Sequence, residues 1–260
     1  MAAELLKVNH LTVRFGGLTA VNDVDFSIFP NEIVSLIGPN GAGKTTTFNA
    51  ITGFLKNKAG SVEFDGAELI HLKPHQIAEK GITRTFQITS LFPGLSVLEN
   101  IRTGHHMQES ESVWDALLNT RRKRQAEEDT LAKTVEILRF IGLEGKKEWT
   151  AGNLSYGDQR TLEIGIALAA NPRLLLLDEP SAGLNDTETR GMKELIQKMR
   201  AKSITIFLVE HDMKLVMGIS DRIVVLNFGK KIATGTPEEI KTNPDVIKAY
   251  LGERKRDVAR

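Results

Sequence analysis

Short apolar runs alternate along the chain with segments of helical periodicity. Two stretches near the start, Leu6–Val13 and Val21–Ile28, alternate apolar and polar residues, which predicts half-exposed antiparallel strands. Buried strands are predicted where the apolar run is continuous, at Ile33–Ile37, Leu174–Leu177, Ile204–Val209 and Ile223–Leu226, with a further short strand at Val62–Phe64. This succession is typical of an α/β fold whose mixed or parallel sheet is covered by helices.

The segment from about Leu91 to Leu154 differs, because it has many charges, few β-branched runs and helical spacing. It predicts a helical subdomain, residues 89–171, inserted into a core of residues 1–88 and 172–260 that together form one domain, 1–260. Residues Thr236–Leu251 predict two short helices, and the charged tail Glu253–Arg260 is expected to fray.

Composition narrows the class of protein. The 260 residues are 41% hydrophobic and carry a formal net charge of +1, so the chain can bury a core and lacks the basic excess of a general nucleic-acid binder. It has no cysteine, which excludes disulfides and is typical of a reducing compartment. Its start shows no signal-peptide pattern, and no apolar run approaches the ~18 residues that cross a bilayer. Any membrane role is therefore expected to be peripheral.

The segment GPNGAGKT fits the phosphate-loop pattern, between the strand at Ile33–Ile37 and a helix predicted at Thr45–Thr52. Glycines let backbone N–H groups turn toward phosphates, and the helix N-terminus adds partial positive charge. Lys44 is expected to reach the β- and γ-phosphates, and the Thr45 hydroxyl to bind Mg²⁺. The expected nucleotide contacts of this loop are Gly38, Pro39, Asn40, Gly41, Ala42, Gly43, Lys44, Thr45 and Thr46.

Two acids, Asp178 and Glu179, end the apolar run Leu174–Leu177. A buried strand delivers both to its carboxyl end, where ligands of α/β sheets bind. Asp178 is expected to support Mg²⁺ directly or through water, and Glu179 to orient the attacking water and accept its proton. A helix cap is the alternative use of such a pair. Both patterns occur in many P-loop NTPases, so they predict nucleotide hydrolysis without selecting a family.

The segment LSYGDQ at 154–159 does select a family, because it resembles the signature sequence of ABC ATPases. Tyr156 and Asp158 stand where that family usually has Gly and Gln. The resemblance implies that Ser155, Gly157 and the following helix N-terminus contact an ATP held by the phosphate loop of another chain. The expected assembly is an ATP-dependent head-to-tail dimer, with itself or with a paralogous ATPase. On local grounds alone, Ser155 is also a candidate for a plain helix cap.

Further positions follow the order of the same family. Gln87 resembles the loop glutamine that touches Mg²⁺ or the attacking water, and His211 resembles the switch histidine at the γ-phosphate. Residues Ser181–Asn185 resemble the loop that crosses the dimer seam. Phe15 stands where the family stacks an aromatic ring on adenine, with Val21 beside it, although a core position is the alternative for Phe15. The resemblance thus implies the catalytic set Lys44, Gln87, Glu179 and His211 and the Mg²⁺ set Thr45, Gln87 and Asp178.

Longer stretches resemble the ATP-binding subunits of branched-chain amino-acid importers, namely RFGGLTAV, LSYGDQ, EPSAGLN, EHDMKLVMGISDRIVVLNFGKKIATGTPEEI and Asp245–Gly252. The resemblance is weakest between about Thr103 and Thr130, and Thr161 and Ile166 stand where arginines are expected. It implies an ABC transporter subunit that hydrolyses ATP to power solute import, with branched-chain amino acids as cargo. The alternatives are the ATPase of another importer or of an exporter, and a soluble ABC ATPase outside transport.

The resemblance also implies partners and a location. These are separate transmembrane permease subunits, an extracytoplasmic solute-binding protein reached through them, no nucleic acid, and a peripheral position on the cytoplasmic face of the cell (inner) membrane. The basic run Arg121–Arg124 is followed by acids, which favours a solvated helix face, with lipid contact as the alternative. His71, His75 and His105–His106 are expected to be ordinary surface histidines rather than metal ligands.

Overall fold

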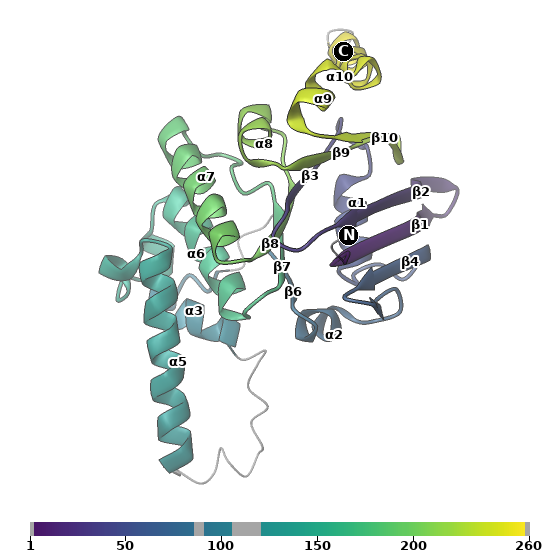
Figure 1. Cartoon of the computed structure of the whole chain (residues 1–260). Coiled ribbons are helices and arrows are strands. Elements are labelled where there is room, and N and C mark those ends of the chain that lie inside the picture. The colour runs from purple at the N-terminus through teal and green to yellow at the C-terminus, as the bar shows by residue number, and fades with distance from the viewer. Residues whose placement is uncertain (1–2, 86–90, 106–120, 258–260) are drawn as a thin grey trace.

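The computed structural model describes residues 3–85, 91–105 and 121–257 of the chain. Two sheets organise these residues (Figure 1). The smaller sheet is antiparallel, with strand order β2-β1-β4-β5, and the larger has the order β10-β9-β3-β8-β7-β6. In the larger sheet β10 runs antiparallel to β9, while β9, β3, β8, β7 and β6 pair in parallel.

The smaller sheet comprises β1 (Leu6–Phe15), β2 (Leu18–Ile28), β4 (Lys58–Phe64) and β5 (Ala67–Glu68). In β1 the buried apolar residues are Leu6, Val8, Leu11 and Val13, so the spacing of two is broken once, between Val8 and Leu11. The pairing of β1 with β2 shifts register at the same place. This β-bulge resets the alternation, so that both halves of the strand face the core.

The larger sheet comprises β3 (Ile33–Ile37), β6 (Ile82–Arg84), β7 (Leu174–Asp178), β8 (Thr205–Val209), β9 (Arg222–Asn227) and β10 (Lys230–Gly235). The run of leucines in β7 shows why these strands are apolar throughout. Leu174 and Leu176 pack with β1, β2 and β4, whereas Leu175 and Leu177 pack against helices on the opposite face. Because both faces are covered, every residue of the run is buried.

The described helices are α1 (Lys44–Ile51), α2 (Pro74–Glu79), α3 (Val97–His105), α5 (Arg121–Phe140), α6 (Tyr156–Ala169), α7 (Asp186–Ala201), α8 (Met213–Ile219), α9 (Pro237–Thr242) and α10 (Pro244–Asp257), with 3₁₀ turns η1 (Glu144–Lys146) and η2 (Ala151–Asn153). Figure 1 places α3, α5 and α6 at one side of the molecule and the antiparallel sheet at the other. The predicted α/β core, N-terminal antiparallel sheet and inserted helical part are therefore confirmed.

Glycines allow the helices of the inserted part to approach closely. A Cβ on Gly104 of α3 would lie 2.3 Å from the Ile166 carbonyl oxygen of α6. A Cβ on Gly165 would lie 2.6 Å from the Ile141 side chain. Ile166 is partly buried in this contact region, which explains an apolar residue at a position where an arginine was expected.

Some elements differ from the sequence predictions. The tail expected to fray from Glu253 continues as helix α10 to Asp257, and residues 258–260 lie outside the described residues. The short strands β5, β6 and β10 and the helix α2 were not predicted, because two to six residues carry too little periodicity to identify an element.

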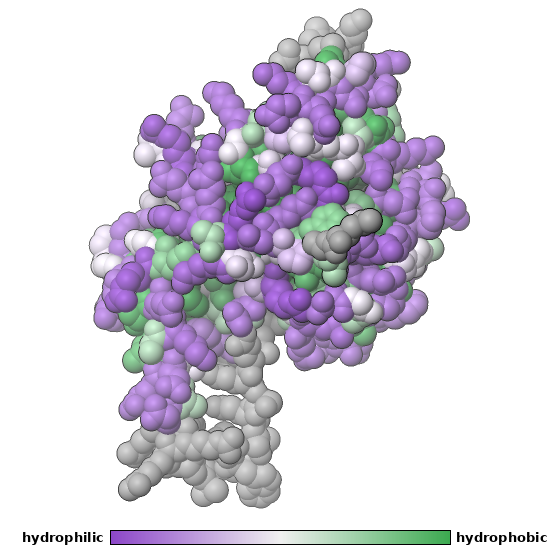
Figure 2. Space-filling model, viewed as in Figure 1, coloured by the Kyte–Doolittle hydropathy of each residue, from purple (hydrophilic) through white to green (hydrophobic). Residues whose placement is uncertain are grey.

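The face shown in Figure 2 is mainly hydrophilic, with hydrophobic residues in small separate areas. Among the described helices, none has both the length and the apolar character required to cross a membrane.

Candidate active site

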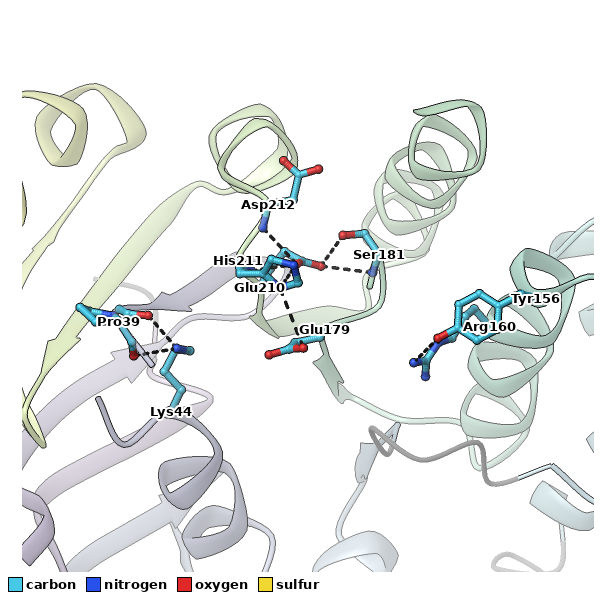
Figure 3. A network of polar contacts seen from close by, with 10 residues as sticks. Pro39, Lys44, Tyr156, Arg160, Glu179, Ser181, Glu210, His211 and Asp212 are labelled. Carbon is cyan, nitrogen blue, oxygen red and sulfur yellow. Dashed lines mark hydrogen bonds and ion pairs between the residues drawn. The ribbon is translucent and has the colours of Figure 1, made fainter. Parts of the chain in front are cut away.

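The loops that carry the predicted chemistry follow parallel strands of the larger sheet. Gly38–Gly43 follow β3, Asp178 ends β7 and is followed by Glu179, and His211 comes two residues after β8. The carboxyl ends of parallel strands share one edge of a sheet, so these loops gather there. Figure 3 shows Glu179 and His211 in contact at this edge, with Lys44 to one side beside Pro39.

The phosphate loop is held in a shape that glycine permits. Gly38, Gly41 and Gly43 have φ of 150°, 76° and 102°. A Cβ on Gly38 would lie 2.1 Å from the Leu226 carbonyl oxygen of β9, and one on Gly43 would lie 2.6 Å from the Ala20 carbonyl oxygen of β2. Larger residues at these two positions would therefore push the loop off the strands behind it.

Helix α1 begins at Lys44 behind Gly43, so no side chain caps its first turn. The Lys44 ammonium donates to the carbonyls of Gly38 and Pro39, at 2.6 and 3.1 Å, and so lies across the loop (Figure 3). Thr45 is exposed, whereas Thr46 is half-buried. The start of α1 thus combines a cation, an exposed hydroxyl and the partial positive charge of a helix N-terminus.

Asp178 is buried in an ion pair that the sequence did not reveal. Arg84, at the end of β6, donates to Asp178 Oδ2 at 2.6 Å and to Asn49 Oδ1 of α1 at 2.5 Å. The Arg84 and Asp178 side chains are 7% and 1% exposed. Asp178 Oδ1 is buried and has no hydrogen-bond partner among the described residues. An unsatisfied carboxylate oxygen suits a hard cation such as Mg²⁺, and the exposed Thr45 hydroxyl is a further oxygen donor, so these residue types fit that ion.

Glu179 and His211, on the loops that follow β7 and β8, lie close together. Glu179 has a φ of 49°, an uncommon left-handed conformation, and its N–H donates to the Val209 carbonyl of β8 at 2.8 Å. His211 Nδ1 lies 3.9 Å from Glu179 Oε2, and the two side chains are 64% and 26% exposed (Figure 3). A carboxylate and an imidazole are thus presented at the surface next to the phosphate loop.

Glu210, the residue before His211, was not singled out by the sequence analysis. Its side chain is completely buried and accepts hydrogen bonds from Ser181, His211 and Asp212. The sequence analysis singled out His211 next to it, but a single acid at the end of a strand gives no sequence signal of burial.

The two residues expected at adenine lie in different environments. Phe15 is 46% exposed at the end of β1, which is contrary to the alternative of a core phenylalanine. Val21 is fully buried, and its Cγ2 would lie 3.4 Å from a Cβ on Gly43. Val21 therefore supports the phosphate loop from behind, and its expected place beside adenine stays a prediction.

The signature segment lies on another part of the chain, at the start of α6. Ser155 is the N-cap of α6, and its Oγ accepts from the Asp158 N–H at 3.2 Å. Gly157 packs so closely on α7 that an added Cβ would lie 2.7 Å from Glu188 Oε1. The helix-cap alternative for Ser155 is thus realised, and Figure 3 shows Tyr156 and Arg160 apart from the group around Lys44.

Residues that follow the signature segment pack among themselves. Arg160 donates to the Tyr156 hydroxyl at 2.7 Å and to Glu163 at 3.1 Å. Burial lowers the pKa of Arg160, but the hydrogen bonds to Glu163 and Tyr156 outweigh it, so that this pKa is raised. Asp158 pairs with Lys146, and the Thr161 hydroxyl donates to the Gly157 carbonyl, so the departures from the family pattern have partners inside the chain.

The remaining predicted residues are placed as follows. Gln87 lies outside the described residues, three positions beyond the end of β6. The Asn185 side chain accepts from the N–H groups of Thr187 and Glu188 and so caps α7. His71 and His75 are exposed as expected. His105 is buried at the end of α3, so the expectation of a surface position was wrong for it, and His106 lies outside the described residues. Arg121–Arg124 belong to α5, and their side chains are not described.

Comparison with known proteins agrees with this geometry. Residues 21–182 match the family described as ABC transporter, and residues 230–256 match the branched-chain amino acid ATP-binding cassette transporter family. The chain is 50% identical over 254 residues to the high-affinity branched-chain amino acid transport ATP-binding protein LivG of Escherichia coli (strain K12), covering 97% of this chain and 100% of LivG.

Solved structures show the same fold. The ADP conformation of MJ1267, an ATP-binding cassette of an ABC transporter, is similar with a TM-score of 0.85 and 31% identity, over 96% of this chain and 100% of that one. A dimeric post-hydrolysis state of the ATP-binding cassette MJ0796, bound to ADP and Pi, is similar with a TM-score of 0.75 and 25% identity, over 89% and 98%. The chain therefore belongs to the ATP-binding cassettes of the ABC transporter family.

Proposed function

We propose that this chain is the ATP-binding subunit of an ABC importer and hydrolyses ATP to power the uptake of branched-chain amino acids. The observation that carries the proposal is that Lys44, Asp178, Glu179 and His211 all come at the carboxyl ends of parallel strands, at one edge of the larger sheet. The names of relatives such as LivG supply the cargo, which the chemistry of the site does not identify.

In this proposal the loop Gly38–Gly43 and the first turn of α1 bind the phosphates of ATP. Backbone N–H groups of the loop and the Lys44 ammonium offset the negative charge of the phosphates. Lys44 exchanges its present carbonyl partners, Gly38 and Pro39, for phosphate oxygens. Phe15, exposed at the end of β1, stacks on the adenine ring.

Thr45, Asp178 and Gln87 would hold Mg²⁺, which when bound neutralises charge on the β- and γ-phosphates. Arg84 holds the Asp178 carboxylate in place through Oδ2. This ion pair also fixes the orientation of Oδ1, which has no hydrogen-bond partner among the described residues. Glu179 orients the attacking water and accepts its proton. His211 contacts the γ-phosphate from the adjacent loop.

Ser155 and Gly157 contribute to the ATP held by a second chain, in a head-to-tail dimer with a copy of this chain or with a paralogous ATPase. The support is twofold. The signature segment stands apart from Lys44 within the chain, and the similar cassette MJ0796 was found as a dimer. Closure would bring the helical part, residues 89–171, against the core of the other chain, residues 1–88 and 172–260.

The permease subunits are separate transmembrane chains, and a solute-binding protein outside the membrane delivers the cargo to them. The present chain then lies at the cytoplasmic face of the cell membrane as a peripheral subunit. An exporter ATPase or a soluble ABC ATPase would share the ATP site but not these partners.

The test is reconstitution of the chain with its permease subunits in vesicles, using Glu179→Gln as the matched inactive variant. We expect Mg²⁺-dependent ATP hydrolysis by the chain, and leucine uptake that requires ATP and intact Glu179. Hydrolysis without any uptake of branched-chain amino acids would contradict the cargo. Absence of hydrolysis would contradict the ATPase assignment itself.

A further inference from the structure

The buried acid Glu210 precedes His211 and has no part in the function proposed above. Its Oε2 accepts from the N–H and hydroxyl of Ser181 at 3.2 and 2.7 Å. Its Oε1 accepts from the N–H groups of His211 and Asp212 at 2.8 and 3.1 Å (Figure 3). A carboxylate that is completely buried needs such donors, because desolvation of an unpaired charge is costly.

These donors come from two different loops. Ser181 lies in the turn that begins at Glu179 after β7, and His211 lies in the loop after β8. The two strands are neighbours, with Asp178 opposite Val209. Glu210 therefore ties the turn that carries Glu179 to the loop that carries His211.

The same carboxylate also reaches the imidazole ring. Glu210 Oε1 lies 3.3 Å from His211 Nδ1. On the other side of the histidine, the Asp212 side chain caps α8 by accepting from Lys214 and Leu215 at 2.8 and 3.3 Å. The backbone of His211 is thus fixed from both sides, while its side chain is 64% exposed.

We propose that Glu210 is a positioning residue for ATP hydrolysis. It holds a proton on Nδ1 of His211, which fixes the ring tautomer and leaves Nε2 for the γ-phosphate. It also couples the ring to Ser181–Asn185, the loop proposed to face the second chain. This inference rests on the proposed function.

The first test reads the tautomer directly in the full chain without nucleotide. Ring ¹⁵N spectra are recorded at about pH 8.5, where histidine is neutral, and the His211→Asn variant assigns the signal among the six histidines. We expect the Nδ1–H tautomer for His211 in the wild type. In Glu210→Gln, whichever way the amide turns, an NH₂ group faces at least one backbone donor, and we expect the Nε2–H population to increase.

The second test separates positioning from folding. We expect Glu210→Gln to lower kcat by about 10- to 100-fold while KM for ATP changes by less than about threefold. Ser181→Ala, which removes one donor and leaves the carboxylate, should lower kcat by less. Glu79→Gln, at an exposed position of α2, is the matched control and should match the wild type.

The outcomes distinguish the two proposals. A wild-type chain that does not hydrolyse ATP contradicts the proposed function. A wild-type chain that does hydrolyse ATP, with an unchanged His211 tautomer and unchanged kcat in Glu210→Gln, overturns the role of Glu210 alone. If Glu210→Gln fails to fold, Ser181→Ala decides: unchanged kcat overturns the coupling, and reduced kcat at unchanged KM supports it.

Discussion

The helix that follows the phosphate loop and the helix that follows Ser155 begin in different ways. Helix α1 starts behind Gly43 without a capping side chain. Asp178 ends β7, and Glu179 and His211 follow β7 and β8 at the same edge of the larger sheet. Helix α6 starts behind Ser155, whose hydroxyl caps the first turn.

This difference shows how the chemistry is divided. The groups that can bind a cation, activate water and neutralise phosphate all lie near α1, on loops that share one sheet edge. The start of α6 offers a hydroxyl, backbone donors and a closely packed glycine. In the proposed head-to-tail dimer, the start of α6 of one chain would add its hydroxyl and backbone donors to the groups near α1 of the other chain.

Loss of the base should have the largest effect. We expect Glu179→Gln to keep ATP binding while turnover falls by about 10²- to 10⁴-fold, since size and hydrogen bonding are retained but the proton acceptor is lost. Steady-state hydrolysis and ATP binding by calorimetry measure the two effects. Glu194→Gln, exposed on α7, serves as the control. Turnover within a few-fold of the wild type would assign the base to another residue.

Breaking the buried ion pair between Arg84 and Asp178 should have the second-largest effect. Arg84→Gln leaves the Asp178 carboxylate buried without its partner, so we expect the free energy of unfolding to fall by about 3–5 kcal/mol. Arg139→Gln breaks an exposed pair with Glu144 in the helical part and should cost no more than about 1 kcal/mol. Urea unfolding of both variants tests this contrast, and equal losses would contradict it.

Removing a lysine near the start of α1 should weaken ATP binding, whereas removing one near the start of α6 should not. We expect Lys44→Ala to weaken ATP binding by about 10- to 150-fold, because a charge-assisted contact is worth about 1.5–3 kcal/mol. Lys146→Ala removes the cation paired with Asp158 beside the signature segment and should leave the affinity of the isolated chain unchanged. Titration calorimetry measures both, and comparable losses would remove the distinction.

The smallest effect is expected at the start of α6. Ser155→Ala removes the N-cap and should lower the free energy of unfolding by about 0.5–2 kcal/mol, whereas Ser155→Gly should cost only a few tenths. Neither change should alter ATP binding by the isolated chain. Chemical unfolding and calorimetry provide the data, and weaker ATP binding by a monomeric Ser155→Ala chain would place Ser155 at its own phosphate loop.

The sequence predicted the loops at the sheet edge because each motif directly follows an apolar run, and parallel strands bring such ends together. Lys44, Asp178 and Glu179 were proposed in this way, and His211 was proposed through the family resemblance. This reasoning from neighbouring residues along the chain did not identify the distant residues that pair with them, such as Arg84. Arg84 and Asp178 are 94 positions apart, and nothing in either segment announces the ion pair.

The sequence also did not predict which individual side chains near the site are buried. The alternating pattern of Val21–Ile28 did not reveal that Val21 is completely buried in β2, in contact range of a Cβ on Gly43. Glutamate is usually exposed, so the burial of Glu210 and its role as a hydrogen-bond acceptor became evident only from the packing of the two loops in the structure. Short elements such as β6, with three residues, depend on neighbouring strands rather than on their own pattern.

Cross-linking between chains tests the shared ATP site most directly. The chain contains no cysteine, so Asn40→Cys in one protein and Ser155→Cys in another give a single defined pair. Both proteins carry Glu179→Gln to retain ATP, and they are mixed with a short bifunctional thiol reagent. The account predicts a covalent dimer of the two variants that forms with Mg²⁺ and ATP and not without nucleotide. A cross-link within one chain of the double variant Asn40→Cys/Ser155→Cys, and none between chains, would contradict it.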